Sequence, residues 1–173
     1  MTDVLAVLKQ GMATEIWGKR FYEQAVARTA SADGKAVFQS LVDEEGQHLD
    51  ILRGEYASVS GDKEWVSVKQ AICMAETVDL VDVFPEADAA EKLIPEDATD
   101  EKALELAMAF EQRGYKLYSE AAEATDDLAA KAVWQWLAKA EDAHYAFLQK
   151  TYDYIRTNGV WYFDDQEKPF FEG

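Results

Sequence analysis

Apolar residues recur at steps of three and four along four long segments, the spacing that places them on one face of an α-helix. The pattern predicts helices over residues 3–30, 34–58, about 99–124 and about 127–157. The turns inside the first pair and inside the second pair are short, so each pair should form an antiparallel hairpin. The pattern therefore predicts an all-α fold.

Polar residues at the segment ends predict the helix boundaries. Ser31 or Asp33 is a candidate N-cap for the second helix. The run Thr99-Asp100-Glu101 gives the third helix an acidic start. Asn158-Gly159 should end the fourth helix as a left-handed cap.

The segment between the hairpins, residues 59–98, is less regular. Val66 to Val83 can hold one shorter helix, whereas Phe84-Pro85 and Ile94-Pro95 should stop helical structure. This segment is the length of a long crossover between two hairpins of a bundle.

A shift of 96 residues aligns the two hairpins without a gap. The matching pairs include Met12–Met108, Glu15–Glu111, Gly18–Gly114, Tyr22–Tyr118, Leu41–Leu137, Glu45–Glu141 and His48–His144. The repeat predicts an antiparallel four-helix bundle of two duplicated hairpins, which we assign to residues 1–157. Residues 158–173 form an aromatic tail, which we expect to pack on the bundle or on a neighbouring subunit.

Both histidines of the chain stand three residues after a glutamate, His48 after Glu45 and His144 after Glu141. Positions i and i+3 share a helix face, so each pair can direct a carboxylate and an imidazole at one ion. One such pair in an acidic chain is weak evidence, but two pairs at one constant offset make coincidence improbable.

Each hairpin adds a further glutamate on its first helix, Glu15 and Glu111. The six residues complete the ligand pattern of carboxylate-bridged di-iron bundles. Four glutamates balance the charge of two divalent ions, which makes their burial tolerable. This ligand chemistry suits iron or manganese.

Composition excludes several functional classes. The net charge of −17 disfavours binding to nucleic acid or to anionic membranes. No apolar run is long enough to span a membrane, and the first residues lack the features of a signal peptide, so we expect a cytoplasmic protein. The single Cys73 excludes a four-cysteine metal site within this sequence, and we expect it to be a small buried apolar residue.

Tyr22 and Tyr118 follow the lone glutamates by seven residues, on the same face. Each hydroxyl can support a ligand carboxylate of the opposite half, or each ring can simply be a core aromatic. Gly18 and Gly114 follow the same glutamates by three residues. We expect close helix packing at Gly18 and an opening for a small oxidant at Gly114.

These motifs resemble the rubrerythrin branch of the ferritin-like superfamily, over residues 1–157. The residues that carry the resemblance are Glu15 with Phe21-Tyr22, Glu44-Glu45-Gly46-Gln47-His48, Glu111 with Tyr118, and Glu141-Asp142-Ala143-His144. The resemblance implies a ferritin-like bundle that holds two iron ions, with manganese or zinc as substitutes. Rubrerythrins carry an extra glutamate where this chain has Gly114.

The resemblance also implies a function, a non-haem di-iron oxidoreductase that reduces hydrogen peroxide or dioxygen. Its electrons should come from a separate donor such as a rubredoxin-like protein, and a homodimer or larger homo-oligomer is expected. Two alternatives stay open at this stage. One is a ferroxidase or iron-handling protein, and the other is a bundle that metals stabilise without catalysis.

Overall fold

The computed structural model describes residues 4–61, 64–75, 78 and 92–161. The helices in these ranges are α1 (Val4–Arg28), α2 (Ala32–Ser60), α3 (Val68–Met74), α5 (Asp100–Ala124) and α6 (Leu128–Asn158). No strand occurs within the same ranges. The predicted all-α fold is confirmed, and the long helices lie within two residues of the predicted boundaries.

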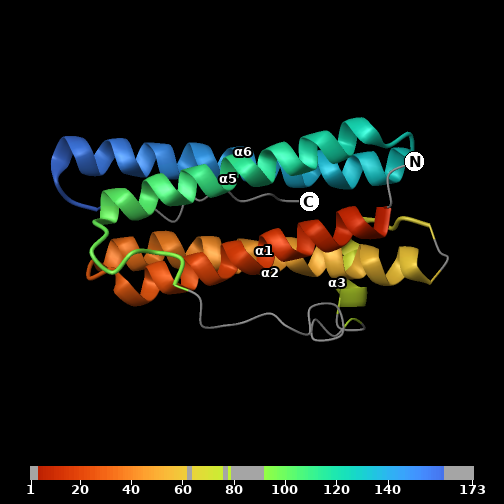
Figure 1. Ribbon diagram of the computed structural model, residues 1–173, viewed down its shortest axis with the longest axis horizontal. Coiled ribbons are helices and arrows are strands. Elements are labelled where there is room, and N and C mark those ends of the chain that lie inside the picture. Colours follow the sequence, from red (N-terminus) through yellow and green to blue (C-terminus); the bar gives the residue numbers. More distant parts are fainter. Residues whose placement is uncertain (1–3, 62–63, 76–77, 79–91, 162–173) are drawn as a thin grey trace.

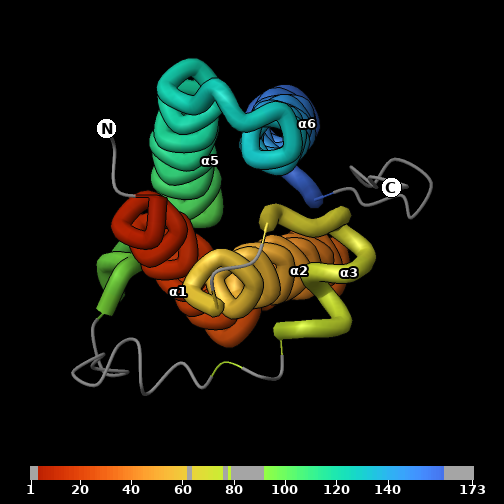
Figure 2. The backbone as a smooth tube through the Cα atoms, turned by 90° about the vertical axis from the view of Figure 1, so that its right-hand side faces the viewer, coloured from red at the N-terminus to blue at the C-terminus, as the bar shows by residue number. Residues whose placement is uncertain are grey.

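Two hairpins, α1–α2 and α5–α6, lie against each other along the long axis of the molecule (Figure 1). Seen along that axis, α1 neighbours α5, and the four long helices surround a common centre (Figure 2). This is the four-helix bundle that the repeat predicted.

Local side-chain chemistry fixes where the long helices begin and end. The hydroxyl of Ser31 accepts a hydrogen bond from the Gly34 N–H, and Thr99 caps α5 in the same way. The carboxylate of Asp127 accepts from two backbone N–H groups at the start of α6. Gly159 ends α6 with φ of 71°, a left-handed conformation that glycine adopts without steric cost. The predicted caps at Ser31 and Gly159 are confirmed.

Within the crossover, α3 is the helix that the structure describes, and it packs on α2 (Figures 1 and 2). Its first turn is closed by reciprocal hydrogen bonds between Ser67 and Gln70, a capping box. Cys73 is exposed on this helix. The expectation of a buried Cys73 was therefore wrong, because so short a helix buries only the face that meets α2. Phe84-Pro85 lies outside the described residues.

The contact between α2 and α3 depends on Gly54. A Cβ atom at this position would lie 1.8 Å from the carbonyl oxygen of Ala71, a backbone atom of α3. Only glycine lets the two backbones approach so closely.

Two apolar clusters occupy the interior on either side of a polar layer. Along α1, Leu8 and Met12 belong to the first cluster, whereas Tyr22 and Ala25 belong to the second. Glu15 lies between them and is fully buried.

Along α5 the order is reversed, because the two helices run in opposite directions. Leu104 and Ala107 belong to the second cluster, and Tyr118 and Ala122 belong to the first. Glu111 lies between them, also fully buried. The charged layer is thus closed off by apolar side chains at both ends.

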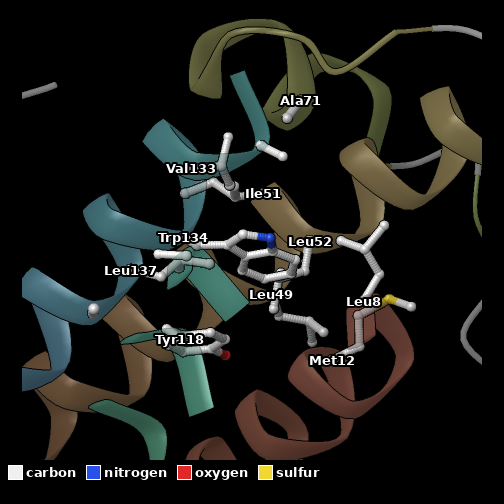
Figure 3. Close-up of a cluster of buried hydrophobic side chains, with 13 residues drawn as sticks. Leu8, Met12, Leu49, Ile51, Leu52, Ala71, Tyr118, Val133, Trp134 and Leu137 are labelled. Atoms are coloured by element: carbon white, nitrogen blue, oxygen red, sulfur yellow. The ribbon is translucent and has the colours of Figure 1, made fainter. Parts of the chain in front are cut away.

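The first cluster is built around Trp134 of α6 (Figure 3). Its ring stacks on Tyr118 with a centroid separation of 5.9 Å and an interplanar angle of 12°. Leu8, Leu52 and Leu137 from three helices surround the pair (Figure 3). This packing fixes the position of the Tyr118 hydroxyl.

The start of the aromatic tail returns to the bundle. Trp161 donates a hydrogen bond from Nε1 to Asp100 and packs edge-on against Phe38, with 5.6 Å between ring centroids. The rest of the predicted tail, including Phe170 and Phe171, lies outside the described residues. Of the helices that the structure describes, none combines the length and apolar character that a bilayer-spanning segment requires.

Glu55 is a buried carboxyl near one end of α2. One of its oxygens accepts a hydrogen bond from the Val66 N–H at 3.2 Å, which ties down the chain before α3. Burial raises the pKa of Glu55 to about 7; the Val66 hydrogen bond opposes this change and the charge of Asp127 reinforces it. The carboxyl is therefore neutral below neutral pH.

Gly54→Ala should destabilise the protein, because the new methyl group would overlap the α3 backbone. We expect a loss of about 1–3 kcal/mol in the free energy of unfolding. Gly46→Ala is the matched control, since Gly46 lies in the same helix with open space at its Cβ position. The control should gain up to about 1 kcal/mol from helix propensity. Urea unfolding of both variants measures the difference, and equal stabilities would contradict the close approach.

Glu55→Gln should change how stability depends on pH. The folded chain keeps the Glu55 proton up to a pKa of about 7, whereas the unfolded chain loses it near 4.5. As pH rises between these values, ionisation of Glu55 should lower the free energy of unfolding by up to about 3 kcal/mol, with no further loss above them. The variant should match wild type at low pH and exceed it at about pH 8 in urea unfolding. A difference that does not vary with pH would argue against a raised pKa.

Candidate metal centre

The bundle brings all six sequence-predicted ligands together in the polar layer. We call these residues the donor cluster, and each is no more than 2% exposed: Glu15, Glu45, His48, Glu111, Glu141 and His144. One candidate ligand atom from each Glu-x-x-His residue lies within 4.8 Å of the others. The spacing of three residues on α2 and on α6 therefore does place each carboxylate and imidazole on one inward face.

The first triad of the cluster joins both halves of the molecule. His48 Nδ1 lies 3.4 Å from Oε2 of Glu15 and 3.2 Å from Oε1 of Glu141. Two of these residues come from the first hairpin, whereas Glu141 comes from α6. The glutamate that precedes the other histidine in sequence thus turns towards His48.

The second triad repeats this arrangement in the other half. His144 Nδ1 lies 3.4 Å from Oε2 of Glu111 and 3.4 Å from Oε1 of Glu45. The two imidazole rings stack with 5.2 Å between centroids. Two equivalent positions, each with two carboxylates and one ring nitrogen, therefore lie side by side.

The donor cluster fits a pair of metal ions on the evidence of its own polar atoms. One atom of each residue is buried without a hydrogen-bond partner in the described part of the chain: Glu15 Oε2, Glu45 Oε1, His48 Nδ1, Glu111 Oε2, Glu141 Oε1 and His144 Nδ1. These are the same atoms that define the two triads. Buried polar atoms are normally paired, so six convergent exceptions point to bound cations.

The two tyrosines link the triads to the apolar clusters. The Tyr22 hydroxyl donates to Oε1 of Glu111, and the Tyr118 hydroxyl donates to Oε1 of Glu15. Each bond crosses from one half to the other, which is the contact considered from the sequence. Each one also leaves Oε2 of the glutamate directed at its histidine.

Charge repulsion divides the four carboxyls into two kinds. Burial and the charges of the other glutamates raise the pKa of Glu45 and of Glu141 well above its usual value. Burial also acts on Glu15 and Glu111, but contacts with the facing histidine and glutamate outweigh it and lower the pKa. Without a cation, the centre therefore favours the neutral forms of Glu45 and Glu141, and a bound cation would oppose both the burial and the repulsion that raise their pKa.

The buried glutamates also change the pKa values of His144, Tyr22 and Tyr118. Burial alone would lower the pKa of His144, but the charge of Glu111 and contacts with Glu111 and Glu44 raise it well above its usual value. Burial and the charge of Glu111 raise the pKa of Tyr22. Burial and the charge of Glu15 do the same for Tyr118. Both hydroxyls stay protonated and act as donors.

Glu44 is a residue of the site that the sequence did not identify as functional. It is buried, and Nε2 of His144 donates to its Oε2 at 3.0 Å. The repeat could not single it out, because position 140 of the other half is alanine. The signal in the sequence that could have identified Glu44 is this difference between the two halves, because it occurs directly beside a predicted ligand.

Gly18 and Gly114 both allow close approach to ligand carboxylates. A Cβ atom at Gly18 would lie 2.9 Å from Phe110 and 3.1 Å from Glu45 Oε2, so the expected close packing is confirmed. At Gly114 a Cβ atom would lie 2.8 Å from Glu141 Oε2. The expected opening at Gly114 was therefore wrong, because the side chain of Glu141 fills that space.

A surface groove approaches the centre from the Gly18 side. Two adjoining hollows of about 340 and 330 Å³ share Trp17, Phe110 and Arg113 between α1 and α5. Phe110 lines both hollows, and a Cβ atom at Gly18 would contact both its ring and the Glu45 carboxylate. This wall of the groove therefore lies close to a ligand oxygen.

A family model described as Rubrerythrin matches residues 6–152, which is most of the 173-residue chain. The matched range contains the whole donor cluster. No curated protein and no solved structure matches the chain.

His48→Ala should remove at least one of two metal equivalents, because each triad supplies one imidazole. The measurement is metal content per chain after loading and desalting. Gln47→Ala is the control, since Gln47 is exposed on the same turn of α2 and should keep both equivalents. Unchanged stoichiometry in His48→Ala would show that the imidazole is not a ligand.

Proposed function

The chain belongs to the rubrerythrin family, and from this and the six buried donor atoms we propose that it is a non-haem di-iron oxidoreductase. Its substrate would be hydrogen peroxide or dioxygen. A separate protein such as a rubredoxin-like donor would supply electrons. The observation that carries the proposal is the convergence of two equivalent triads, each with an unpaired ring nitrogen and two unpaired carboxylate oxygens.

The donor cluster would hold the two ions by the atoms of its triads. When bound, two ferrous ions would supply the two electrons that, with two protons, reduce hydrogen peroxide to two molecules of water. Tyr22 and Tyr118 hold one oxygen of Glu111 and of Glu15, so that the other oxygen stays directed inward.

The surroundings of the centre also suit a small oxidant. Apolar clusters at both ends exclude bulk water from the carboxylates. The groove at Trp17 and Phe110 would be the approach, because Phe110 lies beside Gly18 and the Glu45 carboxylate. The close packing at Gly18 favours hydrogen peroxide or dioxygen over bulky substrates.

The ferrous protein should react with hydrogen peroxide, dioxygen or both at least about tenfold faster than free ferrous ion at the same concentration, equivalent to about 1.4 kcal/mol in barrier. Stopped-flow absorption under each oxidant measures this rate, with His48→Ala as the control that lacks a complete site. Sustained turnover with reduced rubredoxin supports the oxidoreductase. Oxidation with accumulation of ferric mineral would favour an iron-handling protein instead. If neither oxidant reacts faster with the ferrous protein than with free ferrous ion, the protein is a bundle that metals stabilise without catalysis.

A further inference from the structure

The two halves of the centre are equivalent in their ligands but differ in what stands behind the histidines. Glu44 on α2 approaches His144 from the side away from the triad, with 3.0 Å between Oε2 and Nε2. A shift of 96 residues places Ala140 at the position of Glu44. The methyl group of Ala140 cannot accept a hydrogen bond, so the duplicated half has no equivalent contact from this position.

The Glu44 contact determines which nitrogen of His144 is available to a cation. A carboxylate oxygen accepts a hydrogen bond, so the contact holds the proton on Nε2. Nδ1, which faces Glu45 and Glu111, is then the nitrogen that would bind a cation through its lone pair. The contact also fixes the orientation of the ring.

His48 has different surroundings. Its ring packs against that of Trp136 in a T-shaped arrangement, with 5.6 Å between centroids and an interplanar angle of 85°. An aromatic contact restrains the ring by packing, but it adds no negative charge. Glu44, in contrast, brings a fifth buried carboxylate to the His144 side, with Oε1 unpaired in the described part of the chain.

We propose that Glu44 is a positioning residue that makes the two metal positions unequal, so that the Glu45–Glu111–His144 position binds a divalent ion first. A carboxylate behind a ligand histidine commonly strengthens metal binding about 10- to 100-fold. The inference rests on the proposed two-metal centre and adds an order of loading to it.

Zinc titration of the apo protein, followed by ¹⁵N-histidine NMR, tests this directly. The chain has two histidines, so each resonance reports one position. Wild type should show the His144 signals changing over the first equivalent and the His48 signals over the second. A Glu44→Gln sample assigns His144, because it perturbs the Nε2 resonance of that ring alone. Competition with a chromophoric chelator gives the two dissociation constants.

Glu44→Ala should weaken the first zinc site about 10- to 100-fold and leave the His48 site within about twofold, which removes the order of loading. Glu44→Gln retains an oxygen that accepts from Nε2 but loses the charge, so it should recover part of the affinity. Asp43→Asn is the matched control, because Asp43 is an exposed neighbouring carboxylate. It should leave the order and both constants unchanged.

The outcomes separate the inference from the function on which it rests. If wild type binds two ions and both histidines respond together, or His48 responds first, the inference is overturned and the two-metal centre stands. An unchanged first constant in Glu44→Ala also overturns it. Failure of wild type to bind two ions would overturn both. A loss at both positions in Glu44→Ala without recovery in Glu44→Gln would mean that Glu44 only supports packing, which again contradicts the inference.

Discussion

Four glutamate side chains are buried at the centre of the bundle, and the cost of burying them governs the structure around them. Burial without compensation would cost far more than a bundle of this size can spare. Within the layer, Tyr22 and Tyr118 each donate a hydrogen bond to one oxygen of Glu111 or Glu15. An imidazole lies against the other oxygen of each of these two glutamates. The apolar clusters keep water out and so strengthen every interaction in the layer. The donor cluster and the apolar core therefore depend on each other.

The helical framework could be predicted from the sequence because the deciding interactions are local. Helix boundaries follow from caps such as Ser31 and Gly159. The ligand set follows from periodicity, because residues three apart share a face whatever the rest of the fold does. The gapless repeat then relates the two halves, so two weak motifs reinforce each other.

The parts that could not be predicted depend on how side chains fill space between elements. Gly114 suggested an opening, but the side chain of Glu141 turns across the bundle and occupies it. Cys73 looked like a core residue, yet α3 is too short to bury more than one face. Glu44 and Glu45 are adjacent in sequence, and only the nitrogen of His144 that each one faces, Nε2 or Nδ1, distinguishes their roles. The 96-residue repeat identifies the residues that the two halves share, but it does not identify residues such as Glu44 that occur in one half.

Each triad takes residues from both hairpins, and this has a consequence for how the molecule assembles. Neither hairpin alone contains two carboxylates and the histidine that they face. The helices of a hairpin are close in sequence and can pair early, whereas the triads require the two hairpins to meet across the crossover. Ions that occupy the triads would therefore bind after the hairpins have docked, and they would stabilise the contact between the two hairpins. Opening motions of the metal-free chain would accordingly run along the seam between hairpins.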